Sequence, residues 1–324
     1  SKDNGPIVIG VAGAHSGDLA AYGLPTIKAV EIYADIWNAK GGLLGREIKI
    51  TTEDDGCKPE LASNVAAKLT GEKVVGVIGH ICSGATKAAL GIYRDSKILT
   101  ISPSATSPEL ANGEYPNFFR AIAPDDAQAA VEVELIKKLG IKTVAILHDK
   151  GDYGKNFASF VKDILEADGT VEVKLFQGIT PGAVDYSAIL NKVSGQNVDA
   201  VVYGGYHPEA SKLITQMKKS NIDIPFLSAD GIKDDTFIKV AGEYAEGVYA
   251  TGPIDTSSSV MAQQAIKMHK EKYGEEPGTF FLNACAAIES MLKAIEIAGT
   301  TDYEVVRQTL IDSTFETTLG AIGY

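Results

Sequence analysis

Short runs of β-branched and aliphatic residues alternate with longer segments of helical periodicity along most of the chain. Each run is followed by turn residues and then by a segment whose apolar positions recur every three or four residues. Parallel strands need such crossovers, and right-handed crossovers cover both faces of a sheet. The pattern therefore predicts a doubly wound α/β fold. The expected strands are residues 7–13, 48–52, 74–78, 98–101, 143–147, 171–176, 200–203, 225–227 and 248–251.

Several of the intervening segments show an apolar stripe of helical spacing. One begins at Lys58-Pro59-Glu60, which places proline at the first helical position and an acid near the positive end of the helix dipole. From 257 to 312 the chain is predicted to form successive helices without strands. The stripes that we expect to be buried are Leu61, Val65 and Leu69; Val131, Leu135 and Leu139; Phe157, Val161 and Leu165; and Phe281, Cys285, Ile288, Leu292 and Ile295.

The rhythm of strands and helices changes at two places. A short apolar stretch at 118–122 ends in the helix start signal Ala123-Pro124-Asp125-Asp126, where we expect a new sheet to begin. The alternation stops at Thr251-Gly252-Pro253. A length of 324 residues also suits two domains. We therefore expect two lobes joined by a hinge, with residues 1–123 and 253–324 in lobe 1 and residues 124–252 in lobe 2.

Composition removes several classes of function. With 30 basic and 42 acidic residues the net charge is −12, which disfavours binding to nucleic acid or to an anionic membrane surface. No run of about 18 apolar residues is present to span a membrane. The numbered chain shows no cleavable export signal, so it is either cytoplasmic or a mature exported form. Cys57, Cys82 and Cys285 allow at most one intramolecular disulfide, and spacing alone leaves the pairing open.

Motifs for catalysis, nucleotides and metals are absent from the sequence. The glycines around the first strand fit neither G-x-G-x-x-G nor a P-loop, and no G-x-S-x-G elbow occurs. His80 and Cys82 would point to opposite faces of an extended segment, which is poor geometry for a catalytic dyad. The acidic pairs at 54–55, 125–126 and 234–235 are better explained as helix caps and turns. We expect no catalytic residue, metal or cofactor.

Polar segments follow the strands of both halves. Ser83 stands at the expected start of a helix after the third strand, where a hydroxyl and free backbone N–H groups suit a carboxylate. Residues 102–108 and 204–209 follow two further strands, and Asp230 follows the next, where its carboxylate would accept an ammonium group. Together they indicate a zwitterionic ligand. Taken singly, Ser83 is equally explained as a helix cap, Tyr206 as a half-buried aromatic residue and Asp230 as a turn residue.

These segments resemble the periplasmic leucine/isoleucine/valine-binding proteins, the substrate receptors of branched-chain amino-acid ABC transporters. The likeness runs from Ile7 to the end of the chain and implies a type I periplasmic binding fold. The motifs that carry it are Asn38-Ala39-Lys40-Gly41-Gly42, Asp54-Asp55-Gly56-Cys57, Gly79-His80-Ile81-Cys82-Ser83, Pro103-Ser104-Ala105-Thr106, His148-Asp149-Lys150 and Gly204-Gly205-Tyr206-His207-Pro208-Glu209.

The resemblance implies a complete biological role. The protein would be an exported, periplasmic or extracytoplasmic monomer that captures a free L-amino acid of the aliphatic or branched-chain class and delivers it to a membrane permease. It would not be an enzyme. The resemblance also implies a disulfide between Cys57 and Cys82, with Cys285 left as a buried thiol. The alternative is a ligand-sensing domain of a regulatory or signalling system on the same fold, which a fused or partner output domain would identify.

The resemblance also assigns the ligand-binding residues. Ser83 and Thr106 would bind the α-carboxylate, and the Ser104 carbonyl, the Thr106 hydroxyl and Asp230 would hold the α-ammonium. Ala105 lies in the same segment and is included in the site. The side-chain pocket would be walled by Tyr22, Ile81, Cys82, Tyr153, Tyr206 and Phe280.

Two features depart from the family pattern. Close relatives often carry Glu in place of Asp230, so this shorter carboxylate must approach the ligand further or reach it through water. Relatives also usually continue beyond the position of Tyr324 and cross back to the second lobe. We expect that crossover to be either absent or outside the sequence given.

Overall fold

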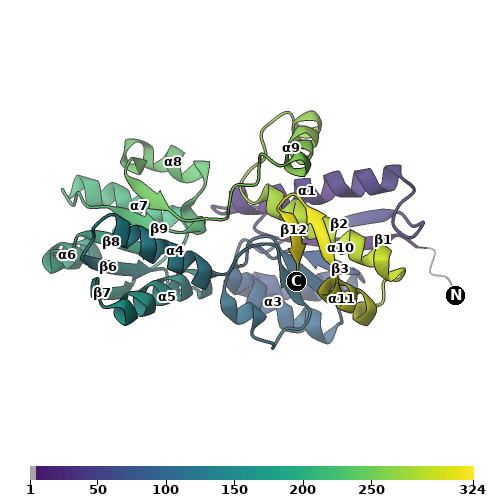
Figure 1. The fold of residues 1–324 in the computed structure, drawn as a ribbon, viewed down its shortest axis with the longest axis horizontal. Helices are drawn as coiled ribbons and strands as arrows, with labels where there is room; N and C mark the ends of the chain where they lie inside the picture. The colour runs from purple at the N-terminus through teal and green to yellow at the C-terminus, as the bar shows by residue number, and fades with distance from the viewer. Residues whose placement is uncertain (1–4) are drawn as a thin grey trace. The chain divides into compact units, whose positions relative to one another are not determined.

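The chain forms two α/β units, each built around a five-stranded parallel sheet (Figure 1). In this computed structural model, which describes residues 5–324, unit 1 extends to Ile122 and resumes at Ile254, and unit 2 comprises Ala123–Pro253. The strand orders are β2-β1-β3-β4-β5 and β10-β9-β8-β6-β7, so the two sheets share one topology. In each sheet the order reverses beside the first strand, which is where open α/β sheets bind ligands. The predicted doubly wound class is confirmed.

Unit 1 buries its sheet between helices from both ends of its sequence. The core joins strand residues such as Ile9 and Ile101 to the stripe of α10, whose five predicted members are all buried. Cys285 lies on this stripe as a buried free thiol. The elements of unit 1 are β1 (Ile7–Gly13), α1 (Ala20–Ala39), β2 (Ile48–Asp54), α2 (Pro59–Gly71), β3 (Gly76–Ile78), α3 (Ser83–Asp95), β4 (Leu99–Ser102), η1 (Pro108–Ala111), β5 (Phe118–Arg120), α9 (Val260–Tyr273), α10 (Phe281–Ala298), α11 (Tyr303–Asp312), β11 (Thr314–Thr317) and β12 (Gly320–Gly323).

Unit 2 covers its sheet with different helices on its two faces. Alternate residues of β6 divide between two cores: Val144 and Ile146 pack with α4 and α5, whereas Ala145 and Leu147 pack with α6 and α7. The elements of unit 2 are α4 (Asp125–Lys138), β6 (Thr143–His148), α5 (Asp152–Asp168), β7 (Glu172–Gly178), α6 (Ser187–Gln196), β8 (Ala200–Gly204), α7 (His207–Lys219), β9 (Phe226–Ser228), η2 (Asp230–Ile232), α8 (Asp235–Ala241), η3 (Gly242–Ala245) and β10 (Val248–Ala250).

Two sequence-based expectations are wrong in detail. The α4 stripe at 131, 135 and 139 is not the buried face, since Val131 is 59% exposed and the helix instead buries Ala129, Val133 and Ile136. Leu61, in the first turn of α2, is exposed although the rest of its stripe is buried. The stretch at 118–120 forms β5, which completes the first sheet beside β4, and the expected helix start after it opens α4, the first element of unit 2. The β11–β12 hairpin was not predicted.

Candidate functional site

In unit 1 the loop after β3 brings a helix start to the carboxyl edge of the sheet. Gly79 has φ +139°, and a Cβ atom there would lie 2.1 Å from the carbonyl oxygen of Ala12, so only glycine fits. Cys82 is the N-cap residue of α3, and Ser83 is its first helical residue. Both side chains are buried. The predicted helix start at Ser83 is confirmed, and its N–H groups lie at the positive end of the helix dipole.

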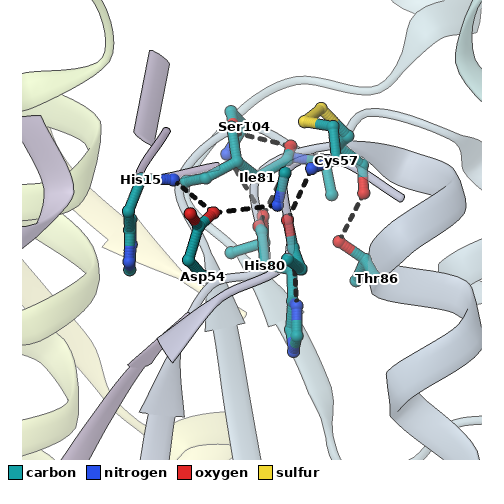
Figure 2. The surroundings of a disulfide bond; sticks show 12 residues. His15, Asp54, Cys57, His80, Ile81, Thr86 and Ser104 are labelled. Atoms are coloured by element: carbon teal, nitrogen blue, oxygen red, sulfur yellow. Dashed lines mark hydrogen bonds and ion pairs between the residues drawn. A yellow bond between two sulfur atoms is a disulfide. The ribbon is translucent and has the colours of Figure 1, made fainter. Parts of the chain in front are cut away.

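Hydroxyl groups tie this loop to the one that follows β4. The Ser104 hydroxyl donates to the Ile81 carbonyl oxygen at 2.8 Å, as Figure 2 shows. The Ser102 hydroxyl donates to the His80 carbonyl oxygen at 2.6 Å and accepts the Ala105 N–H at 2.9 Å. These bonds hold the two loops side by side with their polar groups in fixed positions.

Three further hydrogen bonds order the segment from Ser104 to Ser107. The Ser107 N–H donates to the Ser83 hydroxyl oxygen at 3.2 Å. The Arg120 guanidinium donates to the carbonyl oxygens of Ala105 at 3.3 Å and Ser107 at 2.8 Å. Thr106, which lies between them, is buried. Unit 1 therefore brings together Ile81, Cys82, Ser83, Ser104, Ala105 and Thr106.

A buried polar network and a disulfide join the loop after β3 to the residues that follow β2. His80 Nδ1 is 2.6 Å from an oxygen of Asp55, and its Nε2 is 2.9 Å from the hydroxyl of Tyr93. The other oxygen of Asp55 accepts the Cys57 N–H at 2.7 Å. Cys57 is bonded to Cys82, with Cα atoms 5.4 Å apart (Figure 2), so the expected disulfide is confirmed. Because Cys82 is consumed in this bond, it cannot act as a thiolate nucleophile.

Tyr22 and Phe280 form an aromatic pair in the same unit. Their ring centroids are 5.4 Å apart with planes tilted by 48°. Tyr22 is buried on α1, and Phe280 is the N-cap residue of α10, with φ +65°. The two rings come from segments far apart in the sequence and supply an apolar surface of the kind expected in a ligand pocket.

In unit 2 the predicted residues Tyr153, Tyr206 and Asp230 lie together. The Tyr153 hydroxyl donates to Asp230 Oδ1 at 2.7 Å and accepts the Gly231 N–H at 2.9 Å. The rings of Tyr153 and Tyr206 stack with centroids 5.0 Å apart. The Tyr153 hydroxyl therefore orients the carboxylate of Asp230.

The carboxyl group of Asp230 is buried without a cationic partner at bonding distance. Burial raises its pKa, while the Tyr153 hydroxyl, the Gln128 amide and Lys233 act in the opposite direction. Oδ2 accepts no hydrogen bond within residues 5–324. A buried carboxylate oxygen without a donor is costly unless a positively charged group approaches it. Burial also raises the pKa of Asp149 to about 6.

Gln128 was not among the predicted site residues. This residue of α4 is buried, and its side-chain oxygen accepts the Asp230 N–H at 3.3 Å. Gln128 did not stand out because α4 carries several other polar residues, and the incorrect choice of the buried face concealed it. A correct choice would have placed Gln128 beside Ala129 on the buried side.

Neither a metal site nor a membrane span is found among the described residues. In the part of the chain from 5 to 324, no three His, Cys, Asp or Glu side chains are grouped to hold a metal ion. Within the same range, none of the helices is long and apolar enough to cross a membrane.

The chain is similar to known proteins over nearly its whole length. The family model for the periplasmic binding protein matches residues 6–324. The leucine-, isoleucine-, valine-, threonine- and alanine-binding protein of Pseudomonas aeruginosa is 35% identical over 319 residues, covering 98% of this chain and 85% of that protein.

Two solved structures have the same fold. A leucine-binding protein from Thermotoga maritima matches with a TM-score of 0.90 and 28% identity, covering 98% of this chain and 91% of that one. The substrate-binding protein of a branched-chain amino acid transporter from Streptococcus pneumoniae, solved with isoleucine, matches with a TM-score of 0.87 and 29% identity, covering 98% and 92%.

Two sheets of one topology, each with polar loops at its carboxyl edge, define the class of type I periplasmic binding proteins. The chain belongs to the periplasmic binding protein family, in the group of leucine/isoleucine/valine-binding proteins.

Proposed function

We propose that the protein is an extracytoplasmic receptor that binds a free aliphatic or branched-chain L-amino acid and delivers it to the permease of an ABC transporter. Its relatives are named for binding leucine, isoleucine and valine, and one was solved with isoleucine. These names support this substrate class. In this role the protein performs no catalytic step, works as a monomer and is exported from the cytoplasm.

The two ends of the amino acid are assigned to different units. Ser83 and Thr106 of unit 1 bind the α-carboxylate through their hydroxyls and the N–H groups at the start of α3. The Ser104 carbonyl and Thr106 hydroxyl contribute to the ammonium site, and Asp230 of unit 2 supplies its negative charge.

The side chain of the ligand is recognised by apolar and aromatic groups. We assign this role to Tyr22, Ile81 and Phe280 in unit 1 and to Tyr206 and the ring of Tyr153 in unit 2. The Cys57–Cys82 disulfide adds a further wall and fixes the loop that carries Ser83. These groups carry no net charge, so they suit an aliphatic side chain better than a charged one.

The observation that carries the proposal is the buried carboxylate of Asp230. Its Oδ1 is held by Tyr153, and its Oδ2 accepts no hydrogen bond among the described residues. An α-ammonium group would supply both the missing donor and the compensating charge. A ligand without an ammonium group would leave this oxygen unsatisfied.

A thermal-shift screen of the twenty amino acids tests the proposal. Ligand at about a hundredfold excess over its dissociation constant adds about 2.7 kcal/mol to the free energy of unfolding. We expect leucine, isoleucine and valine to raise the unfolding temperature and aspartate and lysine to leave it unchanged. Unchanged melting with all twenty amino acids would refute the proposal. 4-Methylpentanoate, which is leucine without its ammonium group, is the matched control ligand and should give a much smaller shift.

A further inference from the structure

Gln128 makes two hydrogen bonds with one buried side-chain oxygen. Oε1 accepts the backbone N–H of Asp230 at 3.3 Å and the hydroxyl of Thr251 at 3.3 Å. Gln128 is 5% exposed and lies near the start of α4. The three residues are separated by 102 and 123 positions in the sequence, so these bonds join parts of unit 2 that have no local connection.

The two partners of Gln128 follow neighbouring strands. Asp230 begins the short turn η2 after β9, and Thr251 directly follows β10, which pairs with β9. The Thr251 N–H also donates to the carbonyl oxygen of Ser228 at 3.0 Å. The amide of Gln128 therefore fixes the backbone at the point where Asp230 leaves the sheet, while Tyr153 fixes its carboxylate from the other side.

We propose that Gln128 is a positioning residue that holds the carboxylate of Asp230 in place for the ammonium group of the ligand. This inference rests on the proposed function. A three-residue turn such as η2 has little internal hydrogen bonding, so its position depends on outside partners. Loss of the acceptor on Gln128 leaves the Asp230 N–H buried and unsatisfied and allows the turn to move.

The charges around Asp230 predict a pH signature for this role. Burial raises the pKa of the Asp230 carboxyl, and the Tyr153 hydroxyl, the Gln128 amide and Lys233 lower it. Asp125, at the start of α4, is the other acid that acts on Tyr153. An ammonium ligand requires ionised Asp230, so affinity rises with pH through this pKa. Without the Gln128 amide the pKa rises further, and the midpoint of the affinity profile moves to higher pH.

The test measures L-leucine binding by calorimetry across pH in the wild-type protein and in Gln128→Met, which keeps the length of the side chain and removes its polar atoms. We expect the dissociation constant at neutral pH to rise about tenfold, as for loss of one hydrogen bond to a buried site. We also expect the midpoint of the pH profile to move upward. Thr251→Val removes only the second bond to Gln128 and should change both quantities in the same direction but less. This milder variant supplies the test in the event that Gln128→Met does not fold.

Gln216→Met is the matched control. Gln216 lies on α7 of the same unit, where its side chain accepts the Tyr186 N–H at 2.7 Å and donates to the Val184 carbonyl oxygen at 2.9 Å. Its loss should lower stability but leave the leucine affinity and its pH midpoint unchanged. Equal behaviour of the Gln128 and Gln216 variants would overturn the inference and leave the proposed function intact. Absence of leucine binding by the wild-type protein would overturn both.

Discussion

Glu132 is a buried acid that should make the stability of unit 2 depend on pH. It lies on α4, one turn beyond Gln128, with no exposed surface. Neither carboxyl oxygen makes a hydrogen bond within residues 5–324. Burial alone raises its pKa from the ordinary 4.5 to about 8. The folded protein therefore holds Glu132 in its protonated form at neutral pH, whereas the unfolded chain ionises it.

The magnitude follows from the gap between the two pKa values. The stability contributed by this group is fully present below its ordinary pKa and is lost as pH rises through the folded value. At about 1.36 kcal/mol per pKa unit, the interval from 4.5 to about 8 corresponds to about 5 kcal/mol. Glu132→Gln keeps the shape and cannot ionise, so it should escape this loss.

Urea unfolding followed by circular dichroism measures the effect. Circular dichroism is chosen because the single tryptophan, Trp37, lies in unit 1. We expect the difference in the free energy of unfolding between Glu132→Gln and the wild-type protein to grow in favour of the variant by about 4 kcal/mol between about pH 4.5 and about pH 8.5. Glu134→Gln, at an exposed position on the same helix, should show no such growth. If the free energies of unfolding of the wild-type and Glu132→Gln proteins change with pH in parallel, the pKa of Glu132 is not raised in the folded protein.

Three further variants test the site and the elements that hold it. The double variant Cys57→Ala, Cys82→Ala should lower the free energy of unfolding by about 3.5 kcal/mol, because the disulfide closes a loop across 25 residues. An unchanged urea midpoint would contradict this expectation. Ser83→Ala should weaken leucine binding by about 1 to 3 kcal/mol in calorimetry, and an unaltered dissociation constant would remove Ser83 from the carboxylate site. Gly231→Ala should displace Tyr153, since the added methyl would lie 2.6 Å from its ring and 2.4 Å from the Gly205 oxygen. The leucine affinity and the unfolding temperature should both fall. Gly195→Ala is the control, because the space around Gly195 is open. Equal behaviour of the Gly231 and Gly195 variants would count against the close contact between residue 231 and Tyr153.

The buried face of a helix was predictable where its apolar residues form only one stripe. The α10 stripe of Phe281 and its partners allows one buried face, and all of it is buried. The α4 sequence places apolar residues at 129, 133 and 136 as well as at 131, 135 and 139. Only packing against the sheet and α5 decides between these faces, so periodicity alone chose the wrong one.

The sequence allowed the loops that carry the candidate site to be predicted. It did not allow the hydrogen bonds between their residues to be predicted. The rule that ligands bind at the carboxyl edge of parallel strands located Ser83, Tyr206 and Asp230. The bond between Tyr153 and Asp230 joins residues 77 positions apart, and that between Gln128 and Thr251 joins residues 123 apart. Such pairs depend on how helices lie against the sheet, and no spacing in the sequence encodes them.

Calorimetric titration of the wild-type and Asp230→Asn proteins with L-leucine measures how much the charge of Asp230 contributes to ligand binding. Asparagine keeps the shape of the side chain and the contact with Tyr153 but removes the negative charge. We expect tight binding by the wild-type protein and a loss of about 3 to 5 kcal/mol of binding free energy in the variant, because the ammonium group would be buried without its counter-charge. Equal dissociation constants for the two proteins would contradict this prediction.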